Sequence, residues 1–214
     1  MTEESLTRYR IQFVKGESLR FIGHLDLHRS MERCLRRSNL PLDYSKGFNP
    51  RVRLNLSSAL PLGCTSVAEL ADIWLLSQLD PTAIFQALCS ATPPGLSFVS
   101  VEKIDLKTPS LQSQINGVEY RVEIEETNAL PSLSEAVESL LETDELPRVR
   151  RGKRYDLRPL VHELEIWQDP PDHCSLRMVL NVGEGATGRP EEVLLSLDLD
   201  PTDMLIERTQ LFLE

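Results

Sequence analysis

The residues best suited to bind an anion are arginines that recur at helical spacing. They are Arg29, Arg33, Arg36 and Arg37. Because residues three or four apart share one face of a helix, this spacing predicts a basic face. An apolar stripe at the same spacing comprises Leu27, Met31, Cys34 and Leu35. We therefore expect an amphipathic helix that begins near His24 and ends ahead of Pro41, with one apolar and one basic face.

A loop after this helix places aromatic residues among cationic ones. Its candidate contacts are Tyr44, Lys46, Phe48, Arg51 and Arg53. Gly47 admits backbone conformations closed to other residues, and Pro50 stiffens the exit from the loop. We expect both aromatic rings to be presented, because ring stacking beside cations is the chemistry of nucleic-acid binding. The alternative is that the rings pack in the core and the arginines are only solvated.

His24 and His28 lie one helical turn apart, with Glu32 a further turn along, a spacing that could hold a metal. No HExxH motif or third ligand signal accompanies them, and the cysteines form no CxxC pair. We expect the cysteines to be buried, reduced thiols. They are Cys34, Cys64, Cys89 and Cys174. The sequence therefore predicts no metal site and no cofactor.

The chain carries a net charge of −10, yet its positive charges are concentrated in two segments. Residues 1–57 contain 11 lysines and arginines against 6 acidic residues, and residues 148–158 contain 6 against 1. The second segment adds Arg150, Arg151 and Arg154 as candidate nucleic-acid contacts. Basic islands in an acidic background focus positive potential locally, while the protein as a whole repels random polyanions. We expect a selective anionic partner.

The spacing of apolar residues and of turn residues predicts an α+β fold. In the first half we expect strands at 8–14, 52–56, 67–76 and 96–104, helices at 24–38 and 81–89, and extended chain at 19–22. The second half repeats the order, with strands at 118–125, 157–167, 175–182 and 204–213 and helices at 132–141 and 190–197. This is the ferredoxin-like (βαββαβ) order. We predict two such halves in tandem, residues 1–106 and 118–214, joined by a linker at 107–117.

Four motifs within residues 8–80 carry a resemblance to a known family. They are F-x-G-H-L-D-L, R-x-x-x-R-x-x-R-R, L-P-L-x-Y-S-x-G-F-N-P and A-L-P-L-G-x-x-S-x-A-E. Together they resemble the radical-SAM-linked protein family, a domain of unknown function found beside or fused to cobalamin-binding radical SAM proteins. The resemblance implies a radical SAM protein as partner. The chain has no CxxxCxxC motif, so it does not itself hold the iron–sulfur cluster that such enzymes need.

These observations favour a non-catalytic accessory protein that presents an anionic substrate, such as structured RNA, to a radical SAM enzyme. The alternative is a metal-independent endoribonuclease of the tandem ferredoxin-like type, with His24 and Tyr44 as its acid/base pair. A third hypothesis is protein docking through the same basic face. The acidic N-terminus lacks the pattern of a signal peptide, and no window is apolar enough to cross a membrane, so we expect a cytoplasmic protein without membrane contact.

Overall fold

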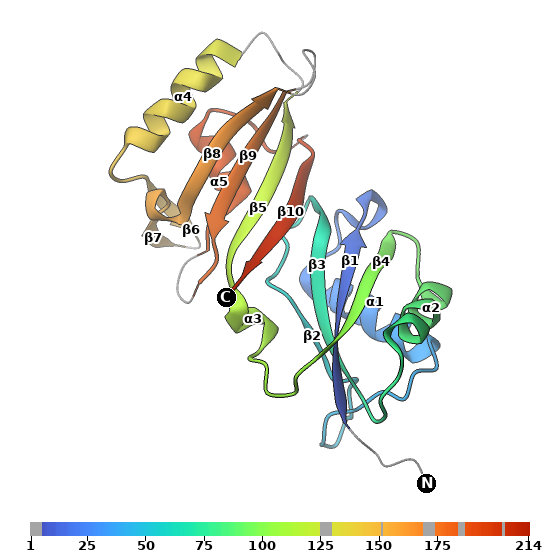
Figure 1. Ribbon diagram of the computed structural model, residues 1–214. Helices are drawn as coiled ribbons and strands as arrows, with labels where there is room; N and C mark the ends of the chain where they lie inside the picture. The colour runs from blue at the N-terminus through green and yellow to red at the C-terminus, as the bar shows by residue number, and fades with distance from the viewer. Residues whose placement is uncertain (1–5, 125–129, 151, 169–173, 184–186, 203) are drawn as a thin grey trace. The chain divides into compact units, whose positions relative to one another are not determined.

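The chain forms an α+β protein, seen here in a computed structural model (Figure 1). The structure describes residues 6–124, 130–150, 152–168, 174–183, 187–202 and 204–214. Its contacts divide the chain into two units, Met1–Gln114 and Ile115–Glu214. Each unit is a small antiparallel sheet with its own helices. Among the described residues, no helix is both long and apolar enough to span a membrane.

The first unit carries the residues that the sequence predicts to bind an anion. Its elements are β1 (Thr7–Lys15), the 3-10 turn η1 (Glu17–Leu19), α1 (His24–Arg37), β2 (Leu54–Leu56), β3 (Cys64–Leu75), α2 (Pro81–Ala91), β4 (Leu96–Ile104) and α3 (Leu111–Gln114). The strands pair in the order β4, β1, β3, β2, and every pair is antiparallel. The short β2 is extended by an isolated bridge between Tyr44 and Val52.

One face of this sheet packs against both α1 and α2. Tyr9, Ile11 and Phe13 alternate along β1 and are completely buried in a core that includes Met31 of α1 and Leu88 of α2. Alternation along a strand sends the intervening residues to the other face. The two helices also contact each other and lie together in Figure 1. The packing therefore fixes which side of α1 is turned toward the core.

The opposite face of β1 holds a buried ionic network. Asp72 accepts hydrogen bonds from Arg8 at 2.5 Å and from Arg10 at 2.8 Å. Arg10 also donates to the side chain of Gln114, and Arg8 donates to the carbonyl oxygens of Thr108 and Pro109. Because buried charges must be paired and hydrogen-bonded, this network ties the segment after β4 to the sheet.

The second unit contains a comparable sheet and an additional hairpin. Its elements are β5 (Ile115–Ile124), α4 (Leu130–Glu142), β6 (Pro147–Arg150), β7 (Lys153–Asp156), the 3-10 turn η3 (Arg158–Leu160), β8 (Val161–Gln168), β9 (Cys174–Asn181), α5 (Pro190–Ser196) and β10 (Ile206–Leu213). Strands β10, β5, β9 and β8 pair in that order, again antiparallel. Among the described residues, strands β6 and β7 form a separate two-stranded sheet, and they carry much of the second basic segment.

The structure departs from the sequence-based expectations at three places. The stretch 19–22, expected to be extended, begins with the last residue of η1 and continues as a turn, and the buried ammonium of Lys15 binds the carbonyl oxygens of Arg20 and Cys64 there. The hairpin β6–β7 was not expected; Gly152 takes a positive φ of 77° at its turn. The segment predicted as a linker contains α3 and the first residues of β5.

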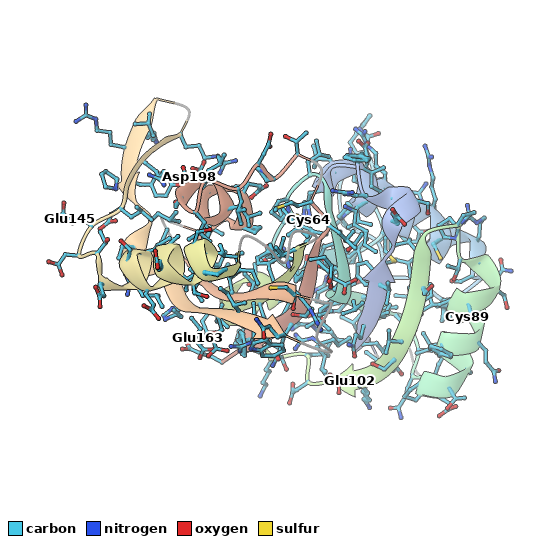
Figure 2. All side chains as sticks on the ribbon, turned by 90° about the horizontal axis from the view of Figure 1, so that it is seen from above. Cys64, Cys89, Glu102, Glu145, Glu163 and Asp198 are labelled. Atoms are coloured by element: carbon cyan, nitrogen blue, oxygen red, sulfur yellow. The ribbon has the colours of Figure 1, made fainter. Side chains whose placement is uncertain are left out.

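The cysteines are all free thiols, but only three of them are buried. Cys34, Cys64 and Cys174 are buried, as predicted, whereas Cys89 on α2 is exposed (Figure 2). The prediction for Cys89 was wrong because its neighbour Leu88 occupies the core-facing position of the helix. Successive residues in a helix are rotated by about 100°, so Cys89 is turned away from the core.

Candidate functional site

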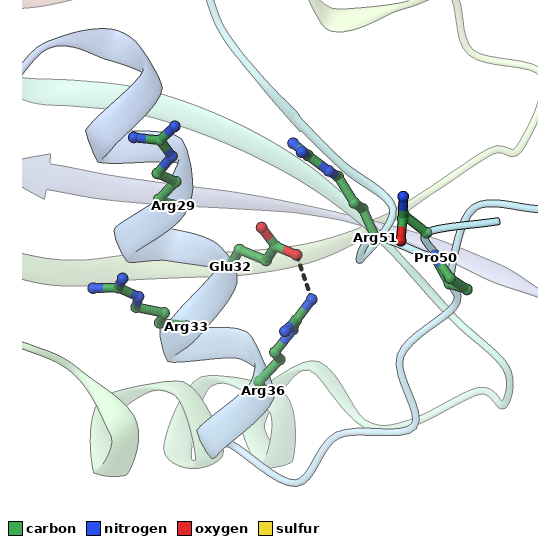
Figure 3. A pocket seen from close by; sticks show the side chains of 7 residues that line it. Arg29, Glu32, Arg33, Arg36, Pro50 and Arg51 are labelled. Carbon is green, nitrogen blue, oxygen red and sulfur yellow. Dashed lines mark hydrogen bonds and ion pairs between the residues drawn. The ribbon is translucent and has the colours of Figure 1, made fainter. Parts of the chain in front are cut away.

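A pocket of about 350 Å³ lies between α1 and the loop that precedes β2 (Figure 3). We call it the Arg pocket. Its lining residues are Arg29, Glu32, Arg33, Arg36, Asn49, Pro50 and Arg51. The basic helix face and the loop, which we expected from the sequence to meet, thus line one site. Glu32 and Arg36 extend from α1 toward the loop, and Arg29 and Arg33 lie along the flank of the helix.

The basic face of α1 is exposed because the apolar face is fixed in the core. Leu27, Met31, Cys34 and Leu35 are buried, as the spacing predicted. Arg29 and Arg33 fall between these positions, Arg36 follows the last of them, and all three are exposed. Hydrophobic packing on one side of the helix therefore orients the arginines on the other.

Two of the four arginines in the Arg pocket are neutralised by carboxylates of the same helix. Arg29 pairs with Asp26 at 2.9 Å, and Arg36 pairs with Glu32 at 2.6 Å. Within the described part of the chain, no carboxylate pairs with the guanidinium of Arg33 or with that of Arg51. The Arg pocket therefore keeps two positive charges without an internal counterion.

The loop wall of the Arg pocket is held at its base by two hydrogen bonds between Ser45 and Arg51. The amide N–H of Ser45 donates to the carbonyl oxygen of Arg51 at 2.8 Å, and the N–H of Arg51 donates to Ser45 Oγ at 3.0 Å. Phe48, between these residues, is fully exposed, and Tyr44 is 42% exposed. The prediction that both rings are presented is confirmed, and the alternative that they fill the core is wrong.

Two arginines predicted as anion contacts also make structural contacts. Arg37 donates to the carbonyl oxygen of Ala91 at the end of α2 at 2.7 Å. Arg53 pairs with Asp43 at 3.0 Å and lies over the ring of Trp74, with its Cζ 4.5 Å from the ring centroid. Neither lines the Arg pocket, and neither does the exposed Lys46.

His24 and Tyr44, the candidate acid/base pair, also lie outside the lining of the Arg pocket. His24 is the first residue of α1, and the N–H groups of Asp26 and Leu27 donate to the preceding Gly23. Tyr44 pairs with Val52 across the base of the loop. The described residues contain no group of three or more side chains placed to hold a metal ion.

The second basic segment belongs to the second unit. Arg150 ends β6 and is half-buried, Arg154 is exposed on β7, and Arg151 lies outside the described residues.

Burial raises the pKa of Tyr155, and Glu192 adds to that rise, while Arg150 and Arg148 oppose it. Burial and the nearby Arg150 lower the pKa of Arg189. Arg148 donates to Ser196 Oγ on α5, so part of this segment serves packing.

The predicted anion contacts lacked three residues that line the Arg pocket, namely Glu32, Asn49 and Pro50. Glu32 had been considered only as a metal ligand, although its spacing of four from Arg36 is that of a helical ion pair. Asn49 had no signal beyond its place in the loop motif. Its position in the lining depends on how the loop folds back toward α1, which is a tertiary contact.

Comparisons with solved structures report likeness of fold. One is a chain in the structure of an H/ACA RNP bound to a substrate RNA containing 2'-deoxyuridine, which is 10% identical in sequence to this chain. The alignment covers 96% of this chain and 49% of that chain, and the TM-score is 0.47. Another is a chain in the structure of a Cbf5-Nop10-Gar1 complex, which is also 10% identical. That alignment covers 96% of this chain and 50% of that chain, and the TM-score is 0.50. The chain spans about half the length of these two proteins. At this identity, the second likeness shows the fold alone.

Sequence comparisons give a family but no characterised relative. No curated protein matches the chain in sequence. A family model matches residues 8–190, which include all of the Arg pocket and most of both units. The chain therefore belongs to the bacterial family described as "Uncharacterized protein conserved in bacteria (DUF2344)".

Proposed function

We propose that this protein binds RNA at the Arg pocket and presents it, without catalysing a reaction itself, to a radical SAM enzyme. The observation that carries the proposal is the pair of guanidinium groups, Arg33 and Arg51, that have no carboxylate partner within the described residues and line one pocket. A guanidinium group offers a planar set of donors that matches phosphate oxygens.

Phe48 favours a nucleic acid over other anionic partners. Its ring is fully exposed and adjoins Asn49, which lines the Arg pocket. An exposed ring in the loop that also carries Arg51 supports stacking of an unpaired base, which is how proteins commonly bind single-stranded regions of structured RNA. Stacking of this kind contributes roughly 1–3 kcal/mol per base.

The radical SAM partner is inferred from the resemblance of the signature motifs. The helix and loop that carry these motifs form the Arg pocket, which supports a role for the pocket in the shared function. We also interpret the two units as ferredoxin-like halves derived from one duplication. Their principal strands follow the same order, with the fourth beside the first and the third beside the second.

RNA binding is tested with a double variant and a matched control. Arg33→Ala/Arg51→Ala removes the two unneutralised charges, and Lys103→Ala/Lys107→Ala removes two exposed charges elsewhere in the first unit. In fluorescence anisotropy titrations with a labelled stem–loop RNA, we expect the first variant to lose at least about tenfold in affinity, because charge-assisted hydrogen bonds are lost. The control should bind as the wild type does. Equal affinity of all three proteins would refute the proposal.

The same titration separates the accessory role from the nuclease alternative. We expect the RNA to be recovered intact after prolonged incubation with the wild-type protein. Cleavage that is lost in His24→Ala, with RNA binding retained, would favour the nuclease. Co-purification from a bacterial cell tests the partner, and we expect a radical SAM protein to be recovered with this chain.

A further inference from the structure

The hairpin β6–β7 of the second unit holds positive charges that its own fold does not neutralise. Arg150 of β6 lies directly opposite Lys153 of β7, on either side of the turn at Gly152. Residues directly opposite in an antiparallel pair point to the same face, and like charges in such a pair destabilise it. The hairpin therefore retains a repulsive pair where a neutral or opposite pair would stabilise it more.

Contacts with α5 show which face of the hairpin carries this pair. Arg148 is two residues before Arg150 and so shares its face, and it donates to Ser196 Oγ on α5. Its Nε also lies 3.9 Å from a carboxylate oxygen of Glu192 on that helix. Both arginines are half-buried, whereas Val149 between them is 65% exposed. The face that carries the repulsive pair is therefore the one turned toward α5.

A third cation lies beside this face where the chain enters α5. Arg189 immediately precedes α5 and is half-buried. Burial lowers the pKa of Arg189, and Arg150 lowers it further, because the two guanidinium groups are close enough to repel each other. Glu191 partly opposes this shift. Among the residues that the structure describes, no carboxylate forms an ion pair with Arg150, Lys153 or Arg189.

We propose that Arg150, Lys153 and Arg189 form a second RNA-binding site, made entirely of residues of the second unit. We call it the hairpin site. It binds phosphates of the RNA backbone, since a guanidinium group matches phosphate oxygens and bound phosphates offset the repulsion among the three cations. The cations need not share one phosphate, because successive phosphates of a strand can each meet one of them. The hairpin site does not depend on the Arg pocket.

The surface of the hairpin favours a nucleic acid over a protein partner. Its exposed apolar residue, Val149, lies opposite Arg154 and so belongs to the other face. Tyr155 shares the face of the hairpin site but is half-buried, with its hydroxyl out of reach of solvent. The cores of protein interfaces are built on apolar and aromatic anchors, whereas a phosphate backbone requires cations. The hairpin site supplies the second kind of surface.

Arg154 distinguishes this site from a general attraction to the second basic segment. The sequence alone made Arg150 and Arg154 equivalent candidates. In the structure they lie on opposite faces of the hairpin, since Arg150 pairs with Lys153 and Arg154 pairs with Val149. We therefore expect Arg150 to contact RNA and Arg154 not to contact it.

The test measures RNA binding in a full-length protein whose Arg pocket is already disabled. Arg33→Ala/Arg51→Ala is the starting protein, and we expect it to retain measurable affinity for the labelled stem–loop RNA at low salt. Adding Arg150→Ala or Arg189→Ala should each lower that affinity by about five- to tenfold, because a charge-assisted hydrogen bond is lost. Fluorescence anisotropy titration measures the change.

The matched control is Arg154→Ala in the same starting protein. It removes the same charge from the same hairpin, and we expect the affinity to change by less than about twofold. A second measurement excludes damage to the fold. Arg150→Ala relieves the repulsion with Lys153, so its midpoint of thermal unfolding at low salt should stay the same or rise by about 1–3 °C. A fall of the midpoint would show that Arg150 serves packing, and would overturn its assignment to the site.

Four further results would overturn the hairpin site. They are loss of all RNA binding in the starting protein, unchanged affinity in Arg150→Ala and Arg189→Ala, and equal losses in Arg150→Ala and Arg154→Ala. The fourth is competition by polyglutamate as strong as that by unlabelled RNA of the same charge, which would show that the site does not select phosphate. The first three leave the Arg pocket intact, because that pocket is tested by Arg33→Ala/Arg51→Ala against the wild type. Absence of RNA binding by the wild type would refute both sites.

Discussion

At the scale of single residues, Glu32 sets the balance of charge in the Arg pocket. Glu32→Gln removes the negative charge and leaves a side chain of similar size. We expect affinity for RNA to rise by about two- to fivefold. The repulsion between the Glu32 carboxylate and the phosphate is lost, and the positive charge of Arg36 is no longer neutralised by a carboxylate. Anisotropy titration measures the change, with Glu17→Gln in η1 as the control. A fall in affinity would mean that Glu32 acts chiefly by holding Arg36 in position.

The cysteines differ in their expected reactivity. Burial raises the pKa of Cys34, and the nearby Arg37 only partly offsets this rise. A raised pKa lowers the fraction of thiolate at a given pH, so Cys34 should react slowly. Cys89 is exposed, and at pH 8 we expect iodoacetamide to modify it well before the three buried cysteines. Peptide mapping by mass spectrometry measures the order. Modification of Cys34 as fast as Cys89 would contradict its burial.

Spacing along the sequence was sufficient to identify some site residues and insufficient for others. Arg29, Arg33 and Arg36 line the Arg pocket because their separations are those of one helix face. Arg37 belongs to the same sequence pattern but binds the carbonyl oxygen of Ala91, a residue 54 positions away. No local pattern reports such a contact, because it depends on how α1 packs against α2.

At the scale of elements, α1 links the stability of the core to the geometry of the site. Met31 is completely buried on the apolar face of α1, whereas Leu25 on the same helix is 72% exposed. Met31→Ala should lower the free energy of unfolding by about 2–5 kcal/mol, because it leaves a cavity. Leu25→Ala should change that free energy by less than about 0.5 kcal/mol. Urea denaturation followed by circular dichroism measures both. Similar losses in the two variants would contradict the orientation of the helix.

Periodicity located the long elements more reliably than the short ones. The helix expected at residues 24–38 is α1, and the strand expected at 96–104 is β4. The stretch 19–22 was expected to be extended but forms the end of η1 and a turn, where the buried Lys15 binds the carbonyl oxygen of Cys64, 49 residues away. The hairpin β6–β7 was missed because its residues are mostly charged and show little apolar alternation. The first case depends on a contact between distant residues, whereas the second is a local pairing that apolar periodicity does not report.

At the scale of the whole molecule, the distribution of charge restricts where an anion can bind. The net charge of −10 opposes unspecific association with polyanions. The Arg pocket is a local exception built from one helix face and one loop of the first unit. The segregation of charge along the sequence predicted this exception. The lining of the Arg pocket, with Glu32 and Asn49 among the arginines, required the fold.

The dependence of RNA binding on salt tests this account most directly. For single strands, the logarithm of the binding constant falls with the logarithm of salt concentration with a slope of about −0.7 for each phosphate contact. If Arg33 and Arg51 each neutralise phosphate charge, the slope for Arg33→Ala/Arg51→Ala should be shallower than that of the wild type by about 1.4. The slope for Lys103→Ala/Lys107→Ala should equal the wild-type slope. An unchanged slope in the arginine variant would contradict the Arg pocket as the site of RNA binding.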